Sequence, residues 1–261
     1  ALARAAQILG EPSYLDKALA AAAFVSRELR GKDGRLLHRW REQETGGPAC
    51  LDDYAFLIWG LLECYEASLD PAHLREALRL QEEQDDHFWD GQNAGYFFTP
   101  HDGEPLLARQ KEGYDGAIPS GNAVAMLNLI RLGRLTGNEV WEKRAEAVGE
   151  AFSGSIARIP TGHNMFLVAL SWLHFGPCEI VIAGDPAAPD TERLLKTIRG
   201  IYLPHKAVIL RPTGGPDIAD LAPFTREMGM VEGRATAYVC KGHACQNPTT
   251  DPTVLAKLLK H

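Results

Sequence analysis

The sequence has fewer basic than acidic residues. Its 261 residues include 27 Lys and Arg against 34 Asp and Glu, which gives a formal net charge of −7 at pH 7. No long run of Lys or Arg occurs in the chain. Because a general nucleic-acid-binding protein presents a basic face to the phosphates, this charge balance argues against that class.

Long apolar runs are absent and cysteine is scarce. The apolar stretches fall well short of the ~18–20 residues of a membrane-spanning helix, and no signal peptide is recognisable. The five cysteines (Cys50, Cys64, Cys178, Cys240 and Cys245) are few and odd in number, which argues against a disulfide framework. We therefore expect a cytoplasmic protein that does not act on membranes.

The chain also lacks an initiating methionine, since it starts at Ala1 within a helical pattern. We predict that it is the C-terminal part of a longer polypeptide, whose N-terminal half would be its partner. With 45% hydrophobic and 23% charged residues, its composition is that of an ordinary globular protein. The length suits one large domain, or one domain with an appendage.

The informative pattern is an alternation between amphipathic and almost wholly apolar helices. A helix that is apolar around most of its circumference is buried on several sides, whereas an amphipathic helix is buried on one. Amphipathic patterns cover residues 13–30, 72–88 and 140–152, and apolar patterns cover 52–69, 120–135 and 163–175. Short β-like runs at 34–40 and 95–99 separate some of them.

A weak internal repeat accompanies this alternation. Residues 70–77 (DPAHLREA) match residues 138–145 (NEVWEKRA) at an offset of 138 − 70 = 68. Recurring pairs of an outer and an inner helix are typical of stacked helical hairpins. The arrangement that buries one set of helices inside another is an α/α toroid, and a closed toroid needs twelve helices. The roughly seven predicted here correspond to the C-terminal half of such a barrel.

The pattern changes after residue 175. Residues 178–184 and 207–211 read as parallel strands flanking a helix at 191–201, and a further strand at 235–241 and a helix at 252–260 follow. We therefore predict a mainly α chain with two regions, toroid hairpins over 1–175 and a small α/β region over 176–261.

Polar residues gather at the predicted starts of the inner helices. Inner helices of a toroid run parallel, so their N-termini open at one end, where free N–H groups favour anionic or polyhydroxylated ligands. We predict Asp53, Asp115 and His163 as catalytic residues. The substrate-binding residues predicted around them are Asp52, Tyr54, Trp40, Trp89, Arg109, Lys111, Tyr114, Ser120 and Asn122.

Each of these residues also has a structural interpretation. Asp52 or Asp53 can cap a helix, as can Ser120 or Asn122, and the aromatic residues can pack in the core. If one carboxyl group is shielded from water while Arg109 or Lys111 pairs with another, the pKa values of the two carboxyl groups separate. One can then act as an acid and the other as a base, as glycoside chemistry requires. His163 could instead serve as the base of a sugar epimerisation.

The sequence CKGHAC places Cys240 and Cys245 on either side of His243. A zinc site needs a fourth ligand, and this spacing is neither that of a zinc knuckle nor the CxxC of redox enzymes. A structural pair that can be oxidised is the better interpretation. We predict no metal site and no cofactor.

Several ordered motifs resemble one family. These are LDDYAFLIWGLLECYEA at 51–67, FWD at 88–90, GYFFT at 95–99, YDGAIPSGNAVAMLNLIRL at 114–132 and AYVCKGHACQNP at 237–248. Together they resemble the spermatogenesis-associated protein 20-like family, which implies a thioredoxin-like domain followed by a six-hairpin α/α toroid.

The resemblance implies two functions. The first is carbohydrate processing or binding, with epimerase-like or glycosidase-like acid–base chemistry on a sugar in the toroid funnel. The alternative is a non-catalytic module that binds a ligand or partner and is coupled to a thioredoxin-like redox domain. Carboxylates that face an open cleft favour the first, and carboxylates that are all engaged in helix caps and ion pairs favour the second.

Overall fold

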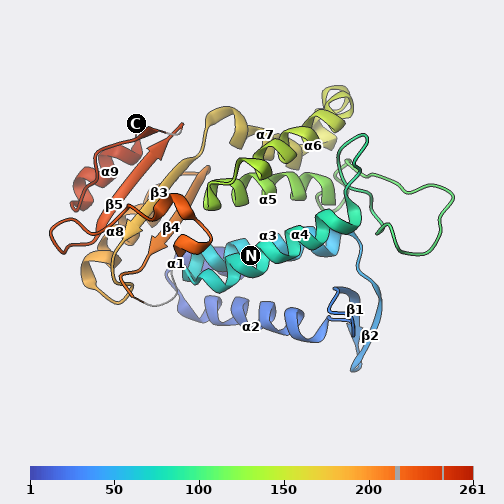
Figure 1. Ribbon diagram of the computed structural model, residues 1–261, viewed down its shortest axis with the longest axis horizontal. Coiled ribbons are helices and arrows are strands. Elements are labelled where there is room, and N and C mark those ends of the chain that lie inside the picture. Colours follow the sequence, from blue (N-terminus) through green and yellow to red (C-terminus); the bar gives the residue numbers. More distant parts are fainter. Residues whose placement is uncertain (215–217, 243, 261) are drawn as a thin grey trace. The chain divides into compact units, whose positions relative to one another are not determined.

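The computed structural model describes residues 1–214, 218–242 and 244–260, and divides into two compact units. The first unit contains Ala1–Ile130 and Val140–Leu170, and the second contains Arg131–Glu139 and Ser171–His261. The predicted division at 175/176 differs from these units at residues 131–139 and 171–175. The chain is mainly α with a small α/β region, as predicted (Figure 1).

Seven α-helices succeed one another up to residue 175. They are α1 (Leu2–Leu9), α2 (Pro12–Glu28), α3 (Leu51–Ser68), α4 (Pro71–Phe88), α5 (Gly121–Thr136), α6 (Glu139–Arg158) and α7 (Asn164–Phe175), with a short 3₁₀ helix at Pro160–Gly162. Most bounds lie within two residues of the prediction. Helix α6 is the exception, because it continues six residues beyond 152.

Burial separates these helices into inner and outer ones, as the apolar pattern predicted. Every residue from 121 to 133 in α5 is buried, whereas α2 has no fully buried residue. Helix α7 departs from the prediction of a helix buried all round, because Leu167 and Val168 are 40% and 46% exposed. Helix α7 therefore has one exposed side.

The internal repeat corresponds to helix starts. Helices α4 and α6 begin at Pro71 and Glu139, which are 139 − 71 = 68 residues apart, the offset seen in the sequence. In the first repeat, Leu69 ends α3 with a φ of 58°, and the Asp70 carboxylate accepts a hydrogen bond from the Ala72 N–H at 2.9 Å. Pro71 then occupies the first turn of α4, where its missing N–H costs nothing.

The predicted β-like run near residue 37 is one arm of a hairpin. Strand β1 (Leu37–Arg41) pairs antiparallel with β2 (Glu44–Pro48), which the sequence did not predict. The second β-like run, at 95–99, is not a strand: Tyr96 forms only an isolated bridge with Trp89. This prediction was wrong because α5 supplies the partner of the Tyr96 backbone through a side chain, as described below.

The second unit contains a four-stranded sheet in the order β4-β3-β5-β6. As predicted, β3 (Cys178–Ala183) and β4 (Lys206–Arg211) are parallel, with α8 (Pro189–Arg199) between them in the chain. Strand β5 (Thr236–Lys241) runs antiparallel to β3 and leads into β6 (Ala244–Cys245) and α9 (Pro252–Lys260). Two 3₁₀ turns, Ile218–Asp220 and Pro223–Thr225, lie between β4 and β5. Across the described residues, no helix has the length and apolar character needed to cross a membrane.

Candidate functional site

The start of α5 lies against the first turn of α3. The backbone N–H of Gly121 donates a hydrogen bond to the Asp52 carboxylate. A Cβ at Gly121 would lie 2.2 Å from Asp52 Oδ1, so any larger residue would displace the Asp52 carboxylate. Burial raises the pKa of the Asp52 carboxyl, and the negative charges of Glu112 and Asp53 raise it further. The Asp52 carboxyl therefore ionises less readily than an exposed aspartate.

Asp115 joins the start of α5 to the start of α7. Its Oδ1 accepts a hydrogen bond from the Ser120 N–H at 2.9 Å, and its Oδ2 accepts one from the Met165 N–H at 2.8 Å. Ser120 also caps α5, since its hydroxyl accepts from the Ala123 N–H at 3.3 Å. The N-termini of three helices, α3, α5 and α7, thus meet at one rim through the carboxylates of Asp52 and Asp115.

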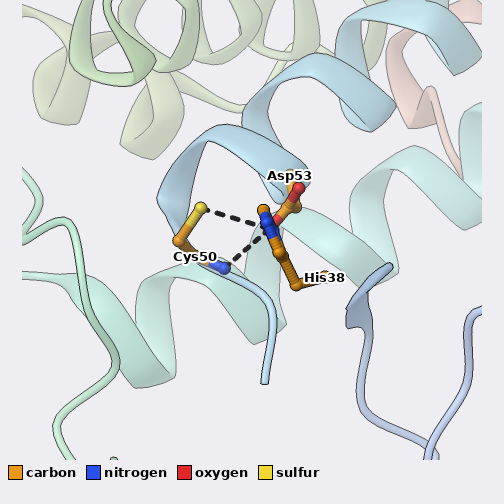
Figure 2. Close-up of side chains that lie close together, drawn as sticks. All are labelled: His38, Cys50 and Asp53. Atoms are coloured by element: carbon orange, nitrogen blue, oxygen red, sulfur yellow. Dashed lines mark hydrogen bonds and ion pairs between the residues drawn. The ribbon is translucent and has the colours of Figure 1, made fainter. Parts of the chain in front are cut away.

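Asp53 lies at the centre of a cluster with Cys50 and His38, shown in Figure 2. Its Oδ2 is 2.8 Å from the Cys50 backbone N, 3.1 Å from the Cys50 Sγ and 2.8 Å from His38 Nδ1. The Cys50 contacts form a capping box at the start of α3. Burial raises the pKa of the Cys50 thiol to about 12, and the Asp53 charge adds to this effect. Cys50 is therefore a thiol that donates to Asp53, rather than an activated nucleophile.

His163 lies directly before α7 and is 4% exposed. Its Nδ1 is 2.8 Å from the Ile159 carbonyl oxygen. Because a carbonyl can only accept, Nδ1 carries the proton, and Nε2 holds the lone pair in the neutral ring. The Tyr114 ring stands edge-on to the imidazole with centroids 5.9 Å apart, and Tyr114 is 62% exposed. A proton acceptor and an exposed aromatic ring therefore lie together.

Asn122 is a structural residue with no exposed surface. Its Oδ1 accepts a hydrogen bond from the Tyr96 N–H at 2.8 Å, and its Nδ2 donates to the carbonyl oxygens of Tyr96 and Glu112, each at 2.9 Å. The side chain therefore takes the place of a neighbouring strand for Tyr96. Asn122 does not cap α5; of the two predicted candidates, Ser120 does.

Arg109 and Lys111, the two basic residues predicted at the site, do not pair with the predicted catalytic acids. Arg109 donates to the backbone carbonyls of Thr99 and His87 and lies over the Phe97 ring, 4.1 Å from its centroid. Lys111 forms an ion pair with Asp90 at 2.5 Å, and this bond holds the pKa of the Asp90 carboxyl far below its usual range. The prediction that these cations hold one of the catalytic acids ionised was wrong, because Arg109 and Lys111 donate their hydrogen bonds to nearby carbonyl and carboxylate oxygens instead.

The remaining predicted ligand-binding residues, Tyr54, Trp40 and Trp89, each contact other side chains of the chain. Tyr54 is 1% exposed, and its hydroxyl donates to Glu83 Oε1 at 2.5 Å. Trp40 packs edge-on against Phe24 with ring centroids 5.2 Å apart. Trp89 is partly buried at the end of α4.

Cys240 and Cys245 are bonded to each other as a disulfide across β5 and β6, in keeping with the predicted structural pair. His243, between them, lies outside the described residues. Sequence reasoning missed Cys50 as a member of the candidate site. The available signal was its position immediately before the apolar helix and three residues before Asp53, a spacing typical of a capping box.

Comparisons with known proteins bear on the chain as a whole. No protein-family model matches it. It is 39% identical to spermatogenesis-associated protein 20 of Rattus norvegicus, over 98% of this chain and 34% of that protein. The Homo sapiens protein of the same name is 38% identical over 97% of this chain and 34% of its own length. An uncharacterised protein of Caenorhabditis elegans is 29% identical over 95% of this chain and 34% of its own length. The chain spans about a third of the length of these relatives, and the resemblance predicted from the motifs is confirmed.

Proposed function

We propose that this chain, which is homologous to one part of spermatogenesis-associated protein 20, contributes hairpins to an α/α toroid that binds and processes a carbohydrate. The ligand binds at the rim where α3, α5 and α7 begin. Free N–H groups and the partial positive charge of helix N-termini favour the oxygen-rich surface of a sugar. The proposal covers only this part of the longer proteins.

One observation carries the proposal: Asp52 and Asp115 bind the N–H groups of the consecutive residues Gly121 and Ser120. This places an acid with a raised pKa beside a second carboxylate at the meeting point of three helix starts. A carboxyl whose pKa is raised is better suited than an exposed one to donate a proton to a sugar oxygen. We therefore assign the role of proton donor to Asp52.

The hydrogen bonds of Asp115 and His163 favour sugar epimerisation over glycoside cleavage. Cleavage needs a second carboxylate that acts as base or nucleophile, but both Asp115 oxygens already accept backbone N–H bonds. When Nδ1 donates to Ile159, Nε2 of the neutral His163 ring carries a lone pair. In this proposal, His163 removes the proton from the carbon beside a carbonyl while Asp52 protonates the carbonyl oxygen, which gives an enediol. A proton from solvent then returns to the opposite face of that carbon while the enediol gives its hydroxyl proton back to Asp52, which restores the carbonyl. Tyr114 supplies a stacking surface.

Solvent deuterium uptake tests this reaction directly. Aldoses and ketoses are incubated with the protein in D₂O, and NMR detects deuterium at the carbon beside the carbonyl. Asp52→Asn keeps an acceptor for the Gly121 N–H but has no acidic proton, and His163→Gln removes the base. Each should slow the exchange by roughly 10²–10⁴. Asp16→Asn, an exposed carboxylate in α2, is the matched control and should exchange at the unchanged rate.

A specific observation favours the second function, a non-catalytic module coupled to a thioredoxin-like domain. Asp53, Asp115, Asn122 and Arg109 all form hydrogen bonds that hold the fold together. A module of this kind would bind sugars or a protein partner without any deuterium exchange.

The catalytic proposal would also be contradicted if the rate of deuterium exchange were the same in Asp52→Asn, His163→Gln and the unsubstituted chain.

A further inference from the structure

Three side chains of different chemistry converge on one point at the start of α3. His38 comes from β1, Cys50 precedes α3, and Asp53 lies in the first turn of that helix. One ligating atom from each lies within 4.8 Å of the other two. Figure 2 shows the imidazole and the thiol directed at the same carboxylate oxygen. We propose that His38, Cys50 and Asp53 form a binding site for a divalent transition metal, with zinc as the best fit.

The backbone holds these ligands in place before any metal binds. The β1–β2 hairpin pairs Leu37 with Pro48, and the Ala49 N–H donates to the Leu36 carbonyl at 3.2 Å, which closes the base of the hairpin. His38 and Cys50 therefore lie on the two chain segments that flank this closed base. Asp53 is fixed by its place in the helix. The backbone positions of the three ligands are therefore set before a metal binds.

The distances suit a tetrahedral site. With metal–ligand bonds of about 2.0–2.3 Å, ligand atoms of a tetrahedral zinc site lie roughly 3.3–3.7 Å apart. The Asp53 Oδ2 is now 2.8 Å from His38 Nδ1 and 3.1 Å from Cys50 Sγ, and both are hydrogen-bonded contacts. Replacing the two shared protons with a metal ion opens these contacts by roughly 0.5 Å. The Cys50 proton leaves to solvent, and the His38 proton moves to Nε2.

Charge and ligand type favour zinc over the alkaline-earth ions. A thiolate and a carboxylate together neutralise a dication, and the imidazole adds a neutral ligand. Mixed nitrogen, sulfur and oxygen ligands suit zinc, whereas calcium and magnesium prefer oxygen alone. The Cys50 backbone N–H, 2.8 Å from Asp53 Oδ2, orients the carboxylate as an outer partner of the site. Because the His38 side chain is 58% exposed, water can reach the fourth position.

A second cluster in the described part of the chain is a weaker candidate. His87, His101 and Asp102 also bring three ligating atoms within 4.8 Å of one another. There the Arg35 guanidinium already forms an ion pair with Asp102 at 2.6 Å. The negative charge that would bind a metal ion is therefore already neutralised by Arg35. This cluster also contains no sulfur, which makes the two sites distinguishable by spectroscopy.

Cobalt titration tests the proposal and is independent of any sugar activity. The chain is stripped with a chelator, kept free of oxygen and without reductant so that the Cys240–Cys245 disulfide stays intact, and titrated with Co²⁺. A cysteine ligand produces a near-ultraviolet thiolate-to-cobalt charge-transfer absorption, and Zn²⁺ should displace the cobalt stoichiometrically. Cys50→Ser is the decisive variant, because serine is a preferred N-cap residue and preserves the start of α3 while the sulfur is removed.

We expect Cys50→Ser to abolish the charge-transfer absorption. His38→Gln and Asp53→Asn should weaken Co²⁺ binding at least ~100-fold, since even the loss of an outer partner costs 10–100-fold. His101→Gln, in the second cluster, is the matched control and should bind Co²⁺ unchanged. Circular dichroism verifies that each variant is folded. Equal Co²⁺ affinity and an unchanged absorption in Cys50→Ser and His38→Gln would overturn the proposal.

Discussion

The side chain of Asn122 and the backbone of Tyr96 exchange two hydrogen bonds, at 2.8 and 2.9 Å, in the same way that two paired strands would. The Tyr96 hydroxyl donates in turn to Asp85 at 2.6 Å. One amide on a buried helix thus holds an extended segment that could not form a sheet by itself.

Replacing this amide should destabilise the protein strongly. Asn122→Ala leaves the N–H and carbonyl of Tyr96 and the carbonyl of Glu112 without their partner. Because an unsatisfied buried polar group costs about 1–3 kcal/mol, the free energy of unfolding should fall by roughly 2–4 kcal/mol. Urea unfolding measures this change. Asn247→Ala, at an exposed position, should stay within about 0.5 kcal/mol of the unsubstituted chain.

Two glycine substitutions should act in opposite directions. A Cβ at Gly121 would lie 2.2 Å from Asp52 Oδ1 and 3.0 Å from Leu51 Cγ. Gly121→Ala should displace the Asp52 carboxylate and cost about 1–3 kcal/mol. Gly60, on the exposed side of α3, has no atom within 4 Å of such a Cβ, so Gly60→Ala should stabilise the helix by about 0.5–1 kcal/mol. Equal melting temperatures for the two variants would contradict the close contact between α3 and α5.

The pH dependence of stability should report the state of Asp52. Burial, with Glu112 and Asp53, raises the folded-state pKa of this carboxyl above its unfolded value. Its contribution to stability is therefore complete below the ordinary Asp pKa of about 3.9 and is lost as the pH rises through the folded-state pKa.

Asp52→Asn does not ionise, so its stability relative to the unsubstituted chain should rise as the pH increases above about 4 and level off once the pH exceeds the folded-state pKa of Asp52. Urea unfolding at several pH values measures the difference. For the exposed control Asp16→Asn, the free energy of unfolding relative to the unsubstituted chain should change little over the same pH range. If the stability of Asp52→Asn relative to the unsubstituted chain instead fell with rising pH, the folded state would favour the ionised form of Asp52 over the protonated form.

The disulfide between Cys240 and Cys245 should be detectable by counting thiols. Denatured without reductant in air-equilibrated buffer, the chain should show three alkylatable cysteines (Cys50, Cys64 and Cys178), and five after reduction. Because the bond closes a very short loop, its loss should cost only about 2 kcal/mol. Mass spectrometry after alkylation gives the count. Five thiols without reductant would contradict the pairing.

Much of the fold was predictable because its signals are local. The apolar run from 121 to 133 and the Asp-Pro pair before α4 are readable in any sequence, and they located α5 and α4 within a residue or two. The run GYFFT was misread as a strand because its β propensity is real. Its hydrogen-bond partner is a side chain 26 residues away, which no local pattern reveals.

The sequence by itself determined the alternation of inner and outer helices and the parallel strands of the α/β region, because burial leaves a periodic trace in the order of residues. It also located the polar residues at the starts of the inner helices. Only the tertiary structure decided how those residues are used. It directed Asp115 to two helix starts, gave Asp52 a raised pKa, sent Arg109 to backbone carbonyls and brought His38 to Cys50. These outcomes depend on distances between segments far apart in the chain, and hydrogen bonds form with whichever partner lies within about 3 Å.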